Sequence, residues 1–218
     1  MKVNIPGRDK VVVARYVAHS IAAADFNDDV WPHCKPVTIA HHWSGSEAPA
    51  SRHAEAQICW TPEALNVRFV CEQHEPLIVA SNPLTDRKTL GLWDRDVCEL
   101  FLAPDPENPA RYFEFEAAPT GEWIDLGIVI TSAGRVTDWG FSSGMSAAAR
   151  IEAQQVLVGM RIPWSSQIPR PDAGSQWRAN LFRCVGPDAA DRYLAWLPTR
   201  TPEPNFHVPD AFGWLEFE

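Results

Sequence analysis

The stretch of residues 92–105 combines polar groups that bind ligands with the pattern of an apolar β-strand. Trp93 stands before a cluster of acidic and basic side chains, and Glu99 interrupts the apolar run that follows. Burying an unpaired carboxylate costs free energy comparable to the net stability of a domain. We therefore expect Glu99 to face either an arginine of the same chain or a bound ligand.

Two further expected strands carry polar side chains in apolar surroundings. In the first, period-two alternation turns Glu114 and Glu116 to one face while the neighbouring phenylalanines face the core. In the second, Asn180 and Arg183 interrupt an apolar run. Because charges are rarely buried without a partner, Arg183 is expected either to pair with Glu99 or to donate to a ligand.

Aromatic residues outside the expected core complete a candidate ligand site. Trp93 is flanked by Asp94, Arg95 and Asp96, and Phe206 lies in a proline-punctuated loop beside Asn205 and His207. The apolar face of a sugar ring packs on an aromatic ring, while carboxylates, amides and arginines bind its hydroxyls. These residue types predict a sugar-binding cleft.

Two other functions compete with sugar binding. A glycosidase needs two carboxylates at a set separation, which Asp96, Glu99, Glu114 and Glu116 could supply. A haem-binding protein needs axial ligands such as histidine, and His207 is the best-placed candidate.

Metal-binding motifs are weak. His41 and His42 are adjacent, so on a strand they would point to opposite faces, and the acidic loop at residues 25–36 has Val30 where a calcium loop requires glycine. We expect no metal at the site and no cofactor, with structural calcium at the acidic turns left open.

The amino-acid composition limits the classes of partner that the chain is expected to bind. The 218-residue chain has a net charge of −9, which argues against nucleic acid and against an anionic membrane surface. We find no apolar run of membrane-spanning length and no signal peptide. Five scattered cysteines favour a reduced, cytoplasmic protein over a disulfide scaffold, although the localisation itself stays open.

Short strands separated by turns, without a long segment of helical period, predict an all-β fold built as an antiparallel sandwich or barrel. Residues 1–20 are expected to form a leader or a first strand, and residues 21–218 a single domain. The expected strands cover residues 36–42, 53–60, 65–73, 96–103, 112–118, 123–131, 147–153, 156–162, 177–185 and 214–218.

Several segments, taken in order, resemble the carbohydrate-binding modules of family 9. The matching residues are Asp25 and Trp31, the hairpin at 59–67, residues 93–101 and 112–115, Arg161 to Trp164, Asn180, residues 195–199 and residues 205–213. The resemblance implies a jelly-roll or immunoglobulin-like β-sandwich that is not itself an enzyme. Such modules usually accompany glycoside hydrolases in polysaccharide catabolism.

The resemblance also implies a way of binding. Family members clamp a sugar between two aromatic rings, for which Trp93 and Phe206 stand at the matching positions, and Glu99 matches the glutamate that binds hydroxyls. Glu116 occupies the position of a family arginine, and Phe182 that of a glutamine.

The expected partner is a mono-, oligo- or polysaccharide, bound by a monomer or a weak homo-oligomer. No residue is expected to be catalytic. The expected ligand-binding residues are Trp93, Arg95, Asp96, Glu99, Glu114, Glu116, Asn180, Phe182, Arg183, Asn205, Phe206 and His207.

Overall fold

The computed structural model describes residues 10–188 and 191–218, and this part of the chain is almost entirely β-structure. Its strands are β1 (Val11–Tyr16), β2 (Val37–Ile39), β3 (His41–His42), β4 (Ala54–Trp60), β5 (Ala64–Glu72), β6 (Val97–Ala103), β7 (Arg111–Ala117), β8 (Trp123–Thr131), β9 (Gly134–Asp138), β10 (Ser146–Ile151), β11 (Gln155–Pro163), β12 (Gln176–Cys184), β13 (Tyr193–Ala195) and β14 (Gly213–Phe217). Short 3₁₀ helices lie at Trp31–His33, Ala50–Arg52, Leu92–Asp94 and Pro209–Ala211.

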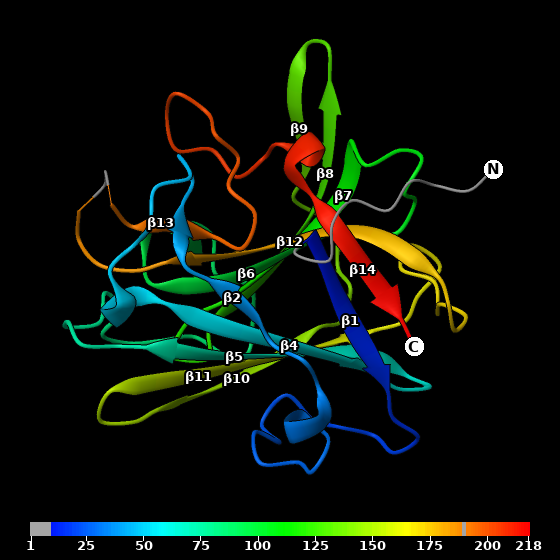
Figure 1. Ribbon diagram of the computed structural model, residues 1–218, viewed down its shortest axis with the longest axis horizontal. Helices are drawn as coiled ribbons and strands as arrows, with labels where there is room; N and C mark the ends of the chain where they lie inside the picture. Colours follow the sequence, from blue (N-terminus) through cyan, green and yellow to red (C-terminus); the bar gives the residue numbers. More distant parts are fainter. Residues whose placement is uncertain (1–9, 189–190) are drawn as a thin grey trace.

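The strands form one continuous sheet that folds over on itself into two layers (Figure 1). One layer runs β10-β11-β5-β4 and the other β12-β6-β7-β8-β9, and β1 and β14 join them. Pairing is antiparallel except for β1, which runs parallel to both of its neighbours, β4 and β14. The predicted all-β sandwich is confirmed, with β1 as an exception to its antiparallel pairing.

Most of the predicted strands are present, but β9 and β13 were missed. All of β9 except Thr137 is exposed, so its sequence lacks the alternation that burial imposes on a strand. Strand β13 has only three residues and pairs with β12 and with β3. Of the segment 1–20, Val11–Tyr16 forms the central strand β1, and residues 1–9 lie outside the described residues.

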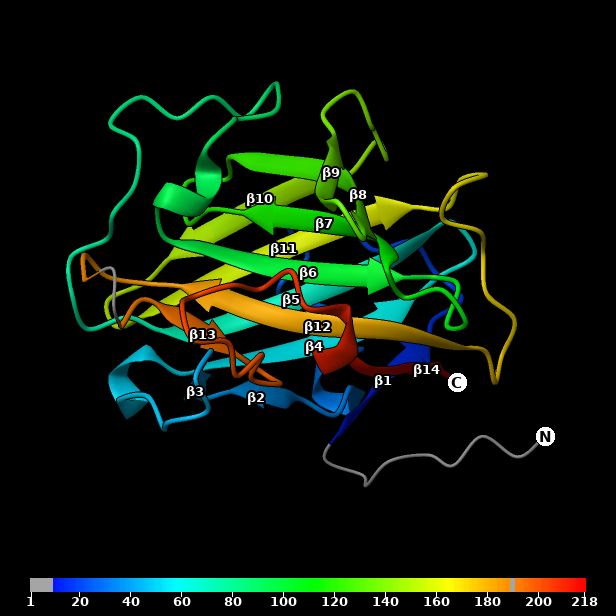
Figure 2. The same ribbon diagram turned by 90° about the horizontal axis from the view of Figure 1, so that it is seen from above.

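Each strand of the β12-β6-β7-β8 layer has two buried faces because loops cover its outer side. The inner face packs against the β4-β5-β11 layer through side chains such as Leu100, Phe115 and Leu181. The outer face carries a second apolar cluster that includes Phe101, Tyr112 and Phe182. In Figure 2, the chain between β13 and β14 crosses over β12 and β6, and from this segment Phe206 and Phe212 join the outer cluster.

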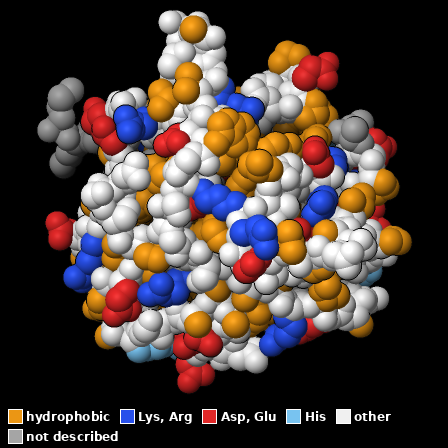
Figure 3. Space-filling view, turned by 180° about the vertical axis from the view of Figure 1, so that it is seen from behind, with side chains coloured by type: hydrophobic (Ala, Val, Ile, Leu, Met, Phe, Trp, Pro, Cys, Tyr) orange, Lys and Arg blue, Asp and Glu red, His pale blue; other side chains and the backbone are white. Residues whose placement is uncertain are grey.

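Acidic and basic side chains lie close together on the surface. On the face drawn in Figure 3, acidic and basic side chains are interspersed with apolar ones, so the net charge of −9 is not gathered there into a patch of one sign. Among the described residues, we find no helix with the length and apolar character needed to cross a membrane.

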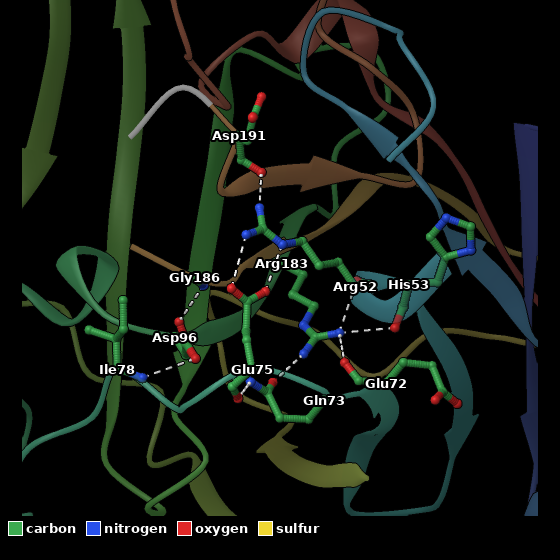
Figure 4. A network of polar contacts seen from close by, with 10 residues as sticks. All are labelled: Arg52, His53, Glu72, Gln73, Glu75, Ile78, Asp96, Arg183, Gly186 and Asp191. Carbon is green, nitrogen blue, oxygen red and sulfur yellow. Dashed lines mark hydrogen bonds and ion pairs between the residues drawn. The ribbon is translucent and has the colours of Figure 1, made fainter. Parts of the chain in front are cut away.

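Arg183 lies on the inner face of the sandwich, so its predicted pairing with Glu99 is wrong. Its guanidinium donates to the backbone carbonyls of Arg52, His53 and Glu72 at 2.8–2.9 Å and to Oε1 of Gln73 at 2.7 Å (Figure 4). Register explains the correction: Phe182 stands opposite Glu99, and its neighbour Arg183 therefore points to the other side of the sheet.

Replacing Arg183 with methionine tests this structural role. Arg183 is 3% exposed, and its loss leaves one buried and three part-buried acceptors without this donor. We expect Arg183→Met to lower the free energy of unfolding by at least about 3 kcal/mol, measured by urea denaturation. The matched control is Arg87→Met, which removes an exposed arginine paired with its neighbour Asp86 and should cost less than about 0.5 kcal/mol. A cost near the control value for Arg183→Met would contradict the assignment.

Candidate functional site

A cavity of about 270 Å³ opens on the outer face of the β12-β6-β7-β8 layer. Strands β6 and β7 supply its floor, strand β9 one side, and the segment before β14 another side. Its lining residues are Trp93, Glu99, Phe101, Glu114, Leu126, Arg135, Thr137, Trp139, Cys184, Tyr193, Pro204, Asn205, Phe206 and His207.

Sheet register places three glutamates side by side beneath this cavity. Glu99 on β6 stands opposite Glu116 on β7, and Glu114 lies two residues away on the same face. One carboxyl oxygen from each lies within 4.8 Å of the others, and all three side chains are buried. Glu99 and Glu114 line the cavity, whereas Glu116 is fully buried behind them. We call these three residues the carboxyl trio.

The carboxyl trio resists ionisation. Burial, with the negative charge of Glu114 as a second cause, raises the pKa of Glu99 to about 8. Burial also raises the pKa of Glu114, and burial together with its two acidic neighbours raises the pKa of Glu116 well above its usual range. At neutral pH the site therefore holds protons on carboxyl groups that would be ionised in water.

His207 closes the cavity above Glu114 as a neutral ring. Its Nδ1 shares a hydrogen bond of 2.7 Å with the hydroxyl of Tyr112, and the same atom lies 4.0 Å from Oε2 of Glu114. Burial, with the positive charge of Arg135 as a second cause, lowers the pKa of His207 to about 3. His207 therefore offers hydrogen-bonding groups to a ligand without offering a positive charge.

Aromatic rings form the walls of the cavity. Trp93 is half-buried, and its ring centroid lies 6.3 Å from that of Trp139, with the planes tilted by 45°. Phe206 is buried and stacks on Phe182, with centroids 4.0 Å apart and planes 15° apart. Tyr193 contacts the edge of Phe206 at 5.6 Å. Phe182 therefore holds Phe206 from behind and does not itself line the cavity.

Besides Arg183, Glu116 and Phe182, three further predicted site residues do not line the cavity, and each has a structural partner. The Asp96 carboxylate accepts from the backbone N–H of Ile78 and Gly186 at 3.2 and 3.0 Å (Figure 4). The side-chain amide of Asn180 donates to the carbonyl of Leu197 and accepts from its N–H, which joins the segment after β13 to β12.

The guanidinium of Arg95, the third of these residues after Asp96 and Asn180, donates to the carboxylate of Glu122 at 3.1 Å. The cavity brings together Trp93, Glu99, Glu114, Asn205, Phe206 and His207 from the predicted set.

Sequence reasoning missed the wall that β9 contributes. Arg135, Thr137 and Trp139 follow one another at a spacing of two and all line the cavity, as one face of a strand would. Trp139 is 55% exposed and stands between Asp138 and Gly140. Such polar flanks are the signal that singled out Trp93, and they could have identified Trp139 as well.

Removing the carboxyl of Glu99 should change how stability depends on pH. A folded-state pKa of about 8, above the usual 4.5, means that the folded protein binds the Glu99 proton more tightly than the unfolded chain does. The stability from this proton is fully present below pH 4.5 and is lost as pH rises toward 8. We expect Glu99→Gln to gain on the order of 2 kcal/mol relative to wild type between pH 5 and pH 8, measured by urea denaturation.

The matched control for this test is the exposed residue Glu107. The difference between Glu107→Gln and wild type should stay constant over the same pH range. A constant difference for Glu99→Gln would show that the carboxyl of Glu99 titrates as it does in water.

Comparison with known proteins places the chain in a family. The family model described as "Carbohydrate-binding family 9" matches residues 36–217. The comparison with curated proteins gives no match.

Solved structures share the fold at low sequence identity. A putative carbohydrate-binding protein from Bacteroides uniformis is 18% identical, with a TM-score of 0.72 over 96% of this chain and 99% of that one. A family 9 carbohydrate-binding module from Caldicellulosiruptor kristjanssonii, solved in complexes with glucose and with cellotriose, is 16% identical, with a TM-score of 0.67 over 96% of this chain. The match covers 96% of the module in the glucose complex and 94% in the cellotriose complex. The chain thus belongs to carbohydrate-binding family 9.

Proposed function

We propose that this chain is a non-catalytic carbohydrate-binding domain and that its ligand occupies the cavity above the carboxyl trio. The observation that carries the proposal is that three separate parts of the chain line one cavity, with Trp93 before β6, Glu99 on β6 and the adjacent pair Asn205 and Phe206 before β14. Family membership supports the same ligand class, as does the structural likeness to a module solved with glucose and with cellotriose.

In this proposal the sugar ring packs against the aromatic walls. Trp93 and Phe206 provide the apolar contacts, and the rigid stacking of Phe206 on Phe182 costs little conformational entropy on binding. Glu99, Glu114 and His207 exchange hydrogen bonds with the hydroxyls. A volume of about 270 Å³ lies at the small end for ligand cavities, which favours a terminal sugar unit over the middle of a long chain.

The arrangement of carboxyl groups favours binding over hydrolysis. A glycosidase places its two carboxyl groups on opposite sides of the scissile bond, at least about 5 Å apart. Here Glu99 and Glu114 lie on the same side of the cavity, on its floor, and Glu116 is buried behind them, so they do not face each other across a bound sugar. A role beside glycoside-degrading enzymes in polysaccharide catabolism fits this non-catalytic site.

The proposal is tested by titrating the protein with glucose and cellotriose in a calorimeter. Wild type should release or absorb heat with a saturable isotherm, and Trp93→Ala should weaken binding at least tenfold because it removes one wall of the cavity. The matched control is Trp214→Ala, because Trp214 lies in a separate groove under the guanidinium of Arg178. Its binding should equal that of wild type.

Two results would contradict this function. One is the absence of heat with glucose, cellotriose and a broader panel of neutral and amino sugars. The other is unchanged affinity in a Trp93→Ala protein that unfolds cooperatively like wild type.

A further inference from the structure

The carboxyl trio lacks the partners that buried acids normally have. The side chains of Glu99, Glu114 and Glu116 are 2%, 4% and 0% exposed. Among the described residues, no group outside the trio donates to either carboxyl oxygen of Glu116 or to Oε2 of Glu114, and Glu99 accepts from the thiol of Cys184 at 3.4 Å. Glu114 and Glu116 can share a proton, but one proton satisfies at most two of these three oxygens. Buried polar atoms are nearly always satisfied, so the trio has an acceptor left for a donor from a ligand.

The positive groups of the described residues near the trio do not neutralise it. Arg192 donates to the carbonyls of Asp94 and Arg95 at 3.0 and 2.7 Å. Arg135 stands exposed at the rim of the cavity, and His207 is neutral. The negative charge of the three carboxyls can therefore be neutralised by protons or by a cationic group of a ligand.

The cavity gives a cationic ligand access to two members of the trio. Glu99 and Glu114 both line it, and Oε2 of Glu114 is a buried acceptor beneath its floor. Trp93 and Trp139 also line the cavity, and aromatic faces attract cations as well as sugar C–H groups. A ligand that carries a flat apolar ring and a single ammonium group would satisfy both features at once.

We propose that the sugar bound by this site carries a protonated amine, as a glucosamine unit does, and that Glu99 and Glu114 accept its N–H groups. This inference rests on the proposed carbohydrate-binding function and names the ligand class within it. An ammonium has three donors and no acceptor, so it complements a floor made of carboxylate oxygens. Glu116 stands opposite Glu99 in the sheet, so a proton lost from either carboxyl leaves a buried negative charge that an ammonium compensates and a hydroxyl does not.

Binding of an ammonium should expel protons from the trio. Glu99 holds a proton at neutral pH in the free protein, and an ammonium beside it favours the carboxylate form. The other charged or titratable groups that influence the trio are Asp94, Cys98, Tyr112, Cys184, Tyr193 and His207, with Arg135 and Arg192 as the positive ones.

The experiment compares two ligands that differ only in the group at C2 of each sugar unit. The β-1,4-linked trimer of glucosamine and cellotriose share their backbone, and the first has an amine where the second has a hydroxyl at each C2. Calorimetry at pH 6, where the amine is protonated, should show at least tenfold tighter binding of the glucosamine trimer. Repeating the titration in buffers of different ionisation enthalpy should show net proton release for the glucosamine trimer and none for cellotriose.

Matched variants locate the preference in the trio. Glu114→Gln and Glu116→Gln keep the shape of the side chain and should bring the ratio of the two affinities at least fivefold closer to one. Glu107→Gln, at an exposed site, should leave the ratio unchanged.

The outcomes separate this inference from the function on which it rests. Cellotriose binding that is as tight as glucosamine-trimer binding, and is lost in Trp93→Ala, would overturn only the amine preference. Failure of both trimers and of the wider sugar panel would overturn the proposed function itself. If Ca²⁺ or Mn²⁺ binds the sugar-free protein and this binding is lost in Glu116→Gln, the trio is a metal site and the amine proposal is wrong.

Discussion

The two-residue period of the β-strand is the constraint on which both the core and the site depend. Along β6, Leu100 and Leu102 pack into the interior of the sandwich, while Glu99 and Phe101 face the cavity. Strand β7 repeats the arrangement with Phe115 inside and its glutamates outside. A slip of one residue in register would bury acids in the core, so packing of the core also fixes the positions of the site residues.

The loops over the site are held by buried polar residues that do not reach the cavity. Asp96 links the start of β6 to Ile78 and Gly186, and Arg192 binds the carbonyls of Asp94 and Arg95 beside Trp93. These contacts fix the chain directly after the tryptophan. They explain why charged residues cluster around Trp93 in the sequence although few of them line the cavity.

The sequence predicted what depends on local pattern and missed what depends on register. Alternation in the segment around Glu114 assigned its faces, and the apolar surroundings of Glu99 predicted its burial. Arg183 was expected to pair with Glu99 or to donate to a ligand because it interrupts an apolar strand as Glu99 does, yet only the alignment of β6 with β12 shows that the two residues lie on opposite faces. Trp139 was not predicted as a site residue because it follows β9, an exposed hairpin strand with little apolar patterning.

Whether a sugar binds in this cavity can be seen directly in the indole N–H signals of the ten tryptophans in an NMR spectrum. On adding cellotriose or the glucosamine trimer, the signals of Trp93 and Trp139 should shift. Those of Trp31 and Trp60, whose indoles donate to the carbonyls of Asp25 and Glu218, should stay in place. Shifts confined to Trp196 and Trp214, which line the separate groove, would contradict the account.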